Sequence, residues 1–406
     1  MKIKGLTIPA FVVIFIFTLA CKENEDPLVD VNFEYSDSLV LEGTSISFKD
    51  LSQGKPTEWS WNFEGGNPEI STMQNPIVTY NNSGEFSVSL FASNRDNSDF
   101  KVMNGIIKVF KKIEPAFSFV PSVNVGDQVS FQDISIGHPT SWNWSFNNGA
   151  PASSQAQNPT ISFTSAGLHE VTLTVSNGVS TESLTSSILV LPANGLILNY
   201  KFNGNILDES ENQNHGQVVG ATLTNDRNGN LNSAYYFDGV NDEVRFPFSG
   251  SFLNLPYSIS CWIYFESLKP AVLGNDVINN QQSGVWLSVG IAPETLNRLG
   301  LSIGNGGTPS PNSRKTFVAD KILEVGQWYH IVGVVENVNS MKIYIDNQLN
   351  TGFYTGFADV YYHSANSGSL GRVWDASSFF HGKLDNIRIY NRPLTSNEVS
   401  LLFQEP

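Results

Sequence analysis

The sequence predicts an all-β protein, and three observations support this fold class. Only 15% of the 406 residues are charged, whereas there are 33 glycines and 12% of the residues are aromatic. Such a composition is typical of many short strands joined by tight turns. No long amphipathic helical pattern follows the first twenty residues, and one alternating aromatic pattern occurs twice. The length predicts about three domains, because domains cluster at roughly 100–200 residues.

The first residues have the pattern of a secretion signal. A basic stretch, residues 1–4, precedes an apolar run over residues 8–19. The run is too short for a typical bilayer-spanning helix and fits the apolar part of a signal peptide. We therefore expect residues 1–20 to direct export.

Cys21 stands directly after the expected cleavage point. This arrangement resembles the lipobox of bacterial lipoproteins, in which the cysteine is acylated after export, although Thr18 stands where that family usually has leucine. The resemblance implies a tether over residues 21–28 and attachment to outer-membrane lipid through acylated Cys21, facing the cell exterior. The alternative is an ordinary cleaved signal peptide with an incidental cysteine.

Charge and cysteine content limit the partners and crosslinks. The formal net charge of −15 argues against nucleic acid as a partner, because binding to phosphates requires clustered lysine and arginine. Cys261 is the only other cysteine and lies in an apolar segment, so we expect a buried thiol and no intrachain disulfide.

An internal repeat organises the first half of the chain. The matching residues are separated by 83 positions throughout (131 − 48), which predicts two copies of one domain, residues 29–110 and 114–191. The matching pairs are Phe48 and Phe131, Trp59 and Trp142, Trp61 and Trp144, Asn75 and Asn158, Gly84 and Gly167, and Asn94 and Asn177.

Within each copy the aromatic residues alternate with polar ones. Trp59, Trp61 and Phe63 share one face of a predicted strand and are expected to form core. The run Gly-x-Pro-x-x-Trp-x-Trp-x-Phe, followed by Asn-Pro and by Gly-x-(Phe/His)-x-Val-x-Leu, resembles polycystic-kidney-disease (PKD) domains. The resemblance implies two Ig-like β-sandwiches that act as a stalk.

Residues 195–406 form a third predicted domain. Segments 257–265 and 327–335 are apolar on both faces, as expected for central strands of a layered sandwich, so Trp262 and Trp328 are predicted to be core. Thr395 and Glu398 have the spacing of a capping box that begins a short helix. In this order the segments resemble the laminin-G-like, concanavalin A-like jelly roll of bacterial surface proteins.

That resemblance implies a structural calcium ion between the turn after the first strand and the last strand. The matching carboxylates are Asp208 and Asp385, and Asn212 is a further oxygen ligand of the kind that calcium prefers. In the alternative interpretation, Asp208 caps a turn and Asp385 pairs with Arg388 or with solvent.

The jelly roll also implies carbohydrate as a ligand, an extracellular polysaccharide or glycoconjugate. Sugar rings stack on exposed aromatic rings, and their hydroxyls pair with polar side chains. The candidate residues lie in a polar loop between strands, in a segment close to that loop in sequence, and in a Ser-Gly segment. They are Trp374, Asp375, Arg372, Tyr361, Tyr362, His363 and Trp286.

No catalytic signature accompanies these residues. Jelly-roll glycosidases of this clan typically carry a Glu-x-Asp-x-(x)-Glu strand, and the sequence has none. We therefore expect a non-enzymatic surface lipoprotein that captures glycans or mediates adhesion. Two alternatives remain: a polysaccharide hydrolase or lyase of the same fold, and a protein-binding structural adhesin.

Overall fold

The computed structural model describes residues 25–247, 254–268, 273–275, 281–289, 296–363, 367–372 and 379–406. Strands dominate these ranges, so the predicted all-β class is confirmed. The chain forms two compact units, one running up to Glu114 with 135–140 and 175–182, the other made of 115–134, 141–174 and 183–406. Among the described helices none has the length and apolar character needed to cross a membrane.

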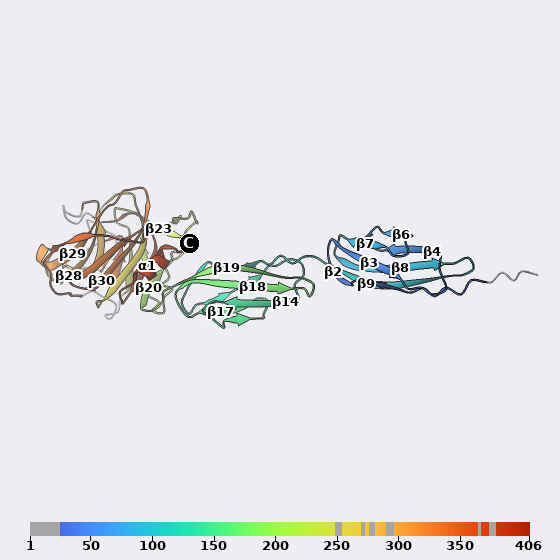
Figure 1. Ribbon diagram of the computed structural model, residues 1–406. Helices are drawn as coiled ribbons and strands as arrows, with labels where there is room; N and C mark the ends of the chain where they lie inside the picture. Colours follow the sequence, from blue (N-terminus) through green and yellow to red (C-terminus); the bar gives the residue numbers. More distant parts are fainter. Residues whose placement is uncertain are drawn as a thin grey trace, which may run out of the picture. The chain divides into compact units, whose positions relative to one another are not determined.

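The first repeat is a β-sandwich of two sheets, with the strand orders β1-β3-β7-β5 and β2-β9-β8-β4-β6 (Figure 1). Its strands are β1 (Phe33–Tyr35), β2 (Leu39–Leu41), β3 (Thr44–Asp50), β4 (Glu58–Phe63), β5 (Gly66–Asn67), β6 (Ile70–Ser71), β7 (Ile77–Tyr80), β8 (Gly84–Ser93) and β9 (Ser98–Phe110).

Alternation along β4 builds the core of this repeat. Trp61 and Phe63 are fully buried between the two sheets, and Trp59 on the same face is half-buried. Trp61 Nε1 donates to the backbone oxygen of Met73 at 2.9 Å, and Trp59 Nε1 donates to Asp50 at 2.9 Å. The core prediction is confirmed for Trp61 and Phe63, and both indole N–H groups are satisfied inside the domain.

The second repeat has the same design, with Trp144 Nε1 bound to the backbone oxygen of Ala156 at 3.0 Å and Trp142 Nε1 to Asp133 at 2.7 Å. Its main sheet has the order β11-β19-β18-β14-β16. The strands are β10 (Phe117–Ser118), β11 (Ser122–Asn124), β12 (Gln128–Ser130), β13 (Gln132–Asp133), β14 (Ser141–Phe146), β15 (Gly149–Ala150), β16 (Ser153–Ser154), β17 (Thr160–Phe163), β18 (Gly167–Ser176) and β19 (Thr181–Leu191).

The C-terminal domain packs two large sheets around one apolar core. In the described residues sheet A has the order β22-β23-β35-β25-β30-β31-β32, with β20 also paired to β35, and sheet B has the order β21-β24-β34-β26-β27-β28-β29-β33. Sheet A contains β20 (Leu196–Tyr200), β22 (Thr222–Thr224), β23 (Ala234–Asp238), β25 (Tyr257–Phe265), β30 (Trp328–Asn337), β31 (Ser340–Ile345), β32 (Gln348–Leu349) and β35 (His381–Tyr390).

Sheet B contains β21 (Gln217–Val219), β24 (Glu243–Pro247), β26 (Leu273–Asn275), β27 (Ser283–Val289), β28 (Arg298–Asn305), β29 (Arg314–Ile322), β33 (Gly352–Gly356) and β34 (Ser367–Leu370), with the short 3-10 helix η2 (Pro311–Ser313) before β29. Cys261 of sheet A is a fully buried core residue with a free thiol, as predicted.

The helix α1 (Ser396–Phe403) covers part of the outer face of sheet A. Thr395 and Glu398 form the predicted capping box, in which each side chain accepts from the other residue's backbone N–H. Val399 and Leu402 of the helix pack on Val332 and Val334 of β30. Leu191, from the last strand of the second repeat, belongs to the same cluster within the second compact unit.

Candidate functional site

The open half of the outer face of sheet A carries aromatic side chains in one register. Alternate residues of β25 belong to the core, so Tyr264 between them points outward. Tyr264 pairs with Trp328 on β30 and with Lys383 on β35, and Lys383 pairs with Tyr236 on β23. Four neighbouring strands therefore place Tyr236, Lys383, Tyr264 and Trp328 side by side. We call these four residues the aromatic row.

Every member of the aromatic row is partly exposed. The Tyr264 and Trp328 rings lie 5.7 Å apart at an angle of 58°, and Lys383 Nζ lies 5.2 Å from the Tyr264 ring centroid. Neighbouring strands are about 4.8 Å apart, so the row extends over about 14 Å. It offers ring surfaces together with one cation to a ligand lying across the strands.

The C-terminal segment covers the other half of this face. Phe403 of α1 stacks on Trp262 with ring centroids 5.6 Å apart, and the Arg227 guanidinium lies 4.5 Å from the Trp262 ring. Trp262 and Trp328 are partly exposed residues of the outer face, so the prediction that both are core is wrong. Their strands look apolar on both faces because α1 covers half of the outer face.

Two buried ion pairs fix this covering segment. Arg388 donates to both carboxylate oxygens of Glu405, at 2.5 and 2.6 Å. Arg227 donates to Asp385 at 2.5 Å and to the backbone oxygen of Glu405 at 2.7 Å. Burial raises the pKa of Asp385 to about 7, although Arg227 opposes that shift. Two arginine–carboxyl contacts shielded from water therefore hold the border of the aromatic row.

His330 lies beneath the C-terminal segment. Its lowered pKa predicts that the stability of the domain depends on pH. Burial, helped by Arg388 and Arg227, lowers the pKa of His330 to about 3, and its Nε2 lies 3.0 Å from Ser260 Oγ. The unfolded chain binds a proton below about pH 6.5, whereas the folded chain does not, so this contribution to stability is lost as pH falls from about 6.5 towards 3.

Between pH 7 and pH 5 we expect the unfolding free energy of wild-type protein to fall by about 2 kcal/mol more than that of His330→Gln. Each pH unit below the pKa of the unfolded state lowers this free energy by about 1.4 kcal/mol. Calorimetric unfolding of both proteins at the two pH values measures this difference. Equal losses in the two proteins would show that His330 titrates normally in the folded state.

Family comparisons agree with this architecture. Residues 30–102 and 116–190 match the PKD domain family, and residues 237–400 match the family described as the concanavalin A-like lectin/glucanases superfamily. The chain carries two PKD domains and one concanavalin A-like domain. A search among curated proteins gives no match.

Solved structures match about half of the chain. One is domain 4 of AbnA, a GH43 extracellular arabinanase from Geobacillus stearothermophilus, in complex with arabinotriose; it is 24% identical, with a TM-score of 0.40 over 52% of this chain and 98% of that chain. Another is the botulinum neurotoxin serotype D ligand-binding domain in complex with N-acetylneuraminic acid, 13% identical, with a TM-score of 0.40 over 52% of this chain and 50% of that chain.

The structure corrects the prediction for Trp286 in the concanavalin A-like domain. Its side chain is only 2% exposed and belongs to the core cluster, so it has no free ring face for a sugar. The Ser-Gly segment around it suggested an exposed ring. The segment is instead β27, an interior strand of sheet B that is buried along its whole length.

Three other predicted ligand residues lie in one segment after β33. Tyr362 is exposed, and its backbone bonds to Gly304 and Gly284 at 2.9 and 2.8 Å, which holds the segment against β27 and β28. Tyr361 and His363 are partly buried, and burial raises the pKa of Tyr361 and lowers that of His363. They remain candidates beside sheet B.

The remaining predicted ligand residues follow β34. Arg372 Nη1 lies 3.4 Å from Oε2 of Glu243 on β24. The Glu243 carboxylate also pairs with Arg245. Trp374 and Asp375 lie outside the described residues. The aromatic row shares no residue with the predicted set, because its members come from four segments that only strand register brings together.

The residues predicted to bind calcium have other partners in the structure. Asp208 accepts hydrogen bonds from the backbone of Asn199, Ser210 and Asn214, which is the turn-capping role of the alternative interpretation. Asn212 Nδ2 donates to a backbone oxygen at 3.3 Å. Asp385 pairs with Arg227 rather than with Arg388 or solvent. Across the described ranges, no three His, Cys, Asp or Glu side chains form a metal-binding group.

Proposed function

We propose that the concanavalin A-like domain binds an extracellular glycan across the aromatic row and does no chemistry on it. The observation that carries this proposal is the shared register of Tyr236, Lys383, Tyr264 and Trp328 on an open sheet face. Pyranose faces stack on aromatic rings, and a linear chain matches a linear set of rings. Lys383 adds a donor for sugar hydroxyl or carboxylate oxygens.

The position of the row beside a fixed border also favours this function. Trp262, stacked under Phe403, extends the apolar surface from Tyr264 towards α1. The aromatic row is therefore the part of a larger aromatic surface that α1 leaves exposed. A bound ligand would cover these exposed rings.

A glycan array with the full protein tests the proposal. We expect Trp328→Ala and Tyr264→Ala each to weaken binding of the best glycan at least tenfold, about 1.4 kcal/mol. Phe357→Ala is the matched control, because Phe357 is a 74% exposed aromatic residue of the same domain outside the row. Unchanged binding in both row variants would refute the row as the site.

Two further measurements separate the alternatives. Release of reducing ends from a polysaccharide panel would identify an enzyme, and a protein partner that sugars do not displace would identify an adhesin. The structural calcium ion stays a prediction, which the same array with and without a chelator tests.

The proposed setting is the outer membrane, with the protein attached through acylated Cys21. Cys21 lies outside the described residues, so the support is its position after the apolar run of a signal sequence. Metabolic labelling with a radioactive fatty acid is expected to mark wild-type protein and to leave Cys21→Ser unlabelled. A labelled Cys21→Ser variant would exclude this site of attachment.

A further inference from the structure

The first PKD domain leaves apolar side chains in water on one face of the sheet β2-β9-β8-β4-β6. Four of them point outward: Phe91 (44% exposed), Phe100 (69%), Val102 (48%) and Ile70 (66%). Phe91 and Phe100 are direct neighbours on β8 and β9. Val102, Ser89, Asn62 and Ile70 are successive cross-strand neighbours on β9, β8, β4 and β6, so Val102 and Ile70 lie on the same face of the sheet. We call the four apolar residues the exposed patch.

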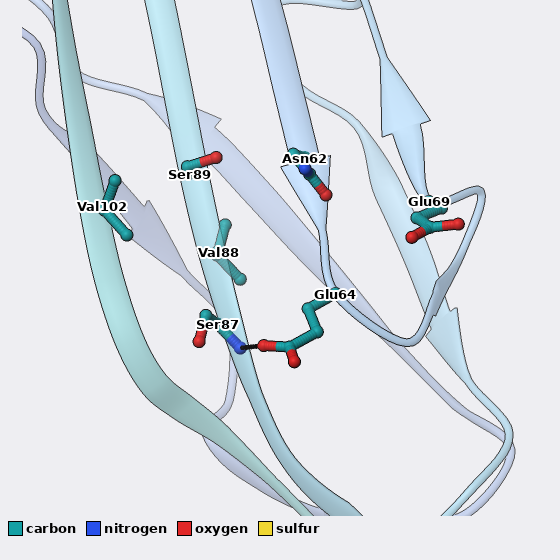
Figure 2. Close-up of a pocket in the computed structure, with 7 residues that line it drawn as sticks. All are labelled: Asn62, Glu64, Glu69, Ser87, Val88, Ser89 and Val102. Atoms are coloured by element: carbon teal, nitrogen blue, oxygen red, sulfur yellow. Dashed lines mark hydrogen bonds between the residues drawn. The ribbon is translucent and has the colours of Figure 1, made fainter.

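Carboxylates lie on one side of the exposed patch. A hollow of about 300 Å³ adjoins the exposed patch. Glu64, Glu69, Asn62 and Val102 help to line it, and their side chains are drawn in Figure 2. Glu64 accepts a hydrogen bond from the backbone N–H of Ser87 at 3.0 Å, and this bond lowers the pKa of Glu64, which keeps its charge. Glu58 adds a third exposed carboxylate on the outer face of β4.

The described strands of this sheet contain two lysines, and neither offsets these carboxylates. The outward-facing Lys108 of β9 is already paired with Glu85 at 2.9 Å. Lys101 of the same strand donates instead to Asn32 at 2.7 Å. The surface that includes the exposed patch is therefore both apolar and negatively charged.

The second PKD domain shows that the fold does not require such a surface. At the positions 83 residues further on, Ile70, Phe91, Phe100 and Val102 are replaced by Ser153, Thr174, Ser183 and Thr185. The hydroxyls pair across the strands, Thr174 with Ser183 and Thr172 with Thr185, each at 2.8 Å. Glu58, Glu64 and Glu69 are likewise replaced by Ser141, Asn147 and Ala152.

We propose that the exposed patch binds a protein partner whose own surface combines apolar side chains with lysine or arginine. Apolar side chains exposed together mark an interaction surface, and the carboxylates beside them select a partner of opposite charge. A second copy of this chain that docks through the same patch does not meet that requirement, because it would bring the same three carboxylates. The second PKD domain, polar at the same positions, would not bind this partner.

The chain supplies its own control variant. The quadruple substitution Ile70→Ser, Phe91→Thr, Phe100→Ser and Val102→Thr installs the residues that the second PKD domain carries in the same strands. We expect its circular dichroism and thermal unfolding to match those of wild-type protein. The probe is a phage-displayed library of random 12-residue peptides, selected on the full wild-type protein.

Peptides combining aromatic or aliphatic residues with lysine or arginine should be enriched. Their synthetic forms should bind the quadruple variant at least tenfold more weakly than wild-type protein. The double variant Glu64→Gln with Glu69→Gln should also bind the peptides at least tenfold more weakly. Added salt should weaken peptide binding to wild-type protein more than to this double variant. The proposal would be overturned if no peptides were enriched or if the enriched peptides lacked cations. Equal binding of the peptides to wild-type protein and to the quadruple variant would also overturn it. So would self-association that the quadruple variant abolishes.

Discussion

Arg388→Met is expected to lower the unfolding free energy of the concanavalin A-like domain by about 3–5 kcal/mol, because it leaves a buried carboxylate without its partner. Arg388 is fully buried, and both of its terminal nitrogens bind Glu405, which is itself buried. The double variant Arg388→Met with Glu405→Leu removes both charges. We expect it to be close to wild type or more stable, since a well-packed apolar pair avoids the desolvation of two ions.

Cys261 allows this domain to be measured within the full protein. Its thiol is fully buried in β25, and burial raises its pKa to about 12. In a Cys21→Ser background it is the only thiol, so its reaction with a thiol reagent in urea follows unfolding of this domain alone. Lys342→Met is the control, because it breaks the partly exposed pair with Glu336 and is expected to cost about 0–1 kcal/mol. Equal losses for Arg388→Met and Lys342→Met would contradict the prediction.

Trp61→Ala and Trp144→Ala are expected to destabilise their PKD domains by about 3–5 kcal/mol each. Each indole fills the space between two sheets and donates its N–H to a backbone oxygen, so the substitution leaves a cavity and removes a hydrogen bond. Hydrogen exchange followed by mass spectrometry should show faster exchange in the peptides of the altered domain.

Phe100→Ser is the control for Trp61→Ala. Phe100 is exposed on the same sheet and is expected to change stability by no more than about 0.5 kcal/mol. If Phe100→Ser destabilised the first PKD domain as much as Trp61→Ala, the exposed patch would be a stabilising surface rather than an interaction surface.

The sequence contained enough information for the repeats and the fold class. The constant separation of 83 residues and the alternation around Trp61 and Trp144 predict two sandwiches, because period-two burial is a local property of strands. The capping box at Thr395 and Glu398 was equally readable, since its partners are three residues apart.

The candidate site was not readable in the same way. Tyr236, Tyr264, Trp328 and Lys383 come from four distant segments, and only the pairing of β23, β35, β25 and β30 aligns them. Strands apolar on both faces gave no sign that α1 covers one half of the face and leaves the other open. Trp286 was predicted to be exposed because serine and glycine lie near it in the sequence, but these small residues are buried with it in β27.

The buried ion pairs at the C-terminal segment have a consequence for affinity. Arg388 with Glu405 and Arg227 with Asp385 hold α1 in place before any ligand arrives. A preorganised border loses little conformational entropy on association, so more of the contact energy appears as affinity. At the glycan site proposed above, a sugar would meet a border that is already in place, so amide exchange in β25 and α1 should be slow both with and without the sugar.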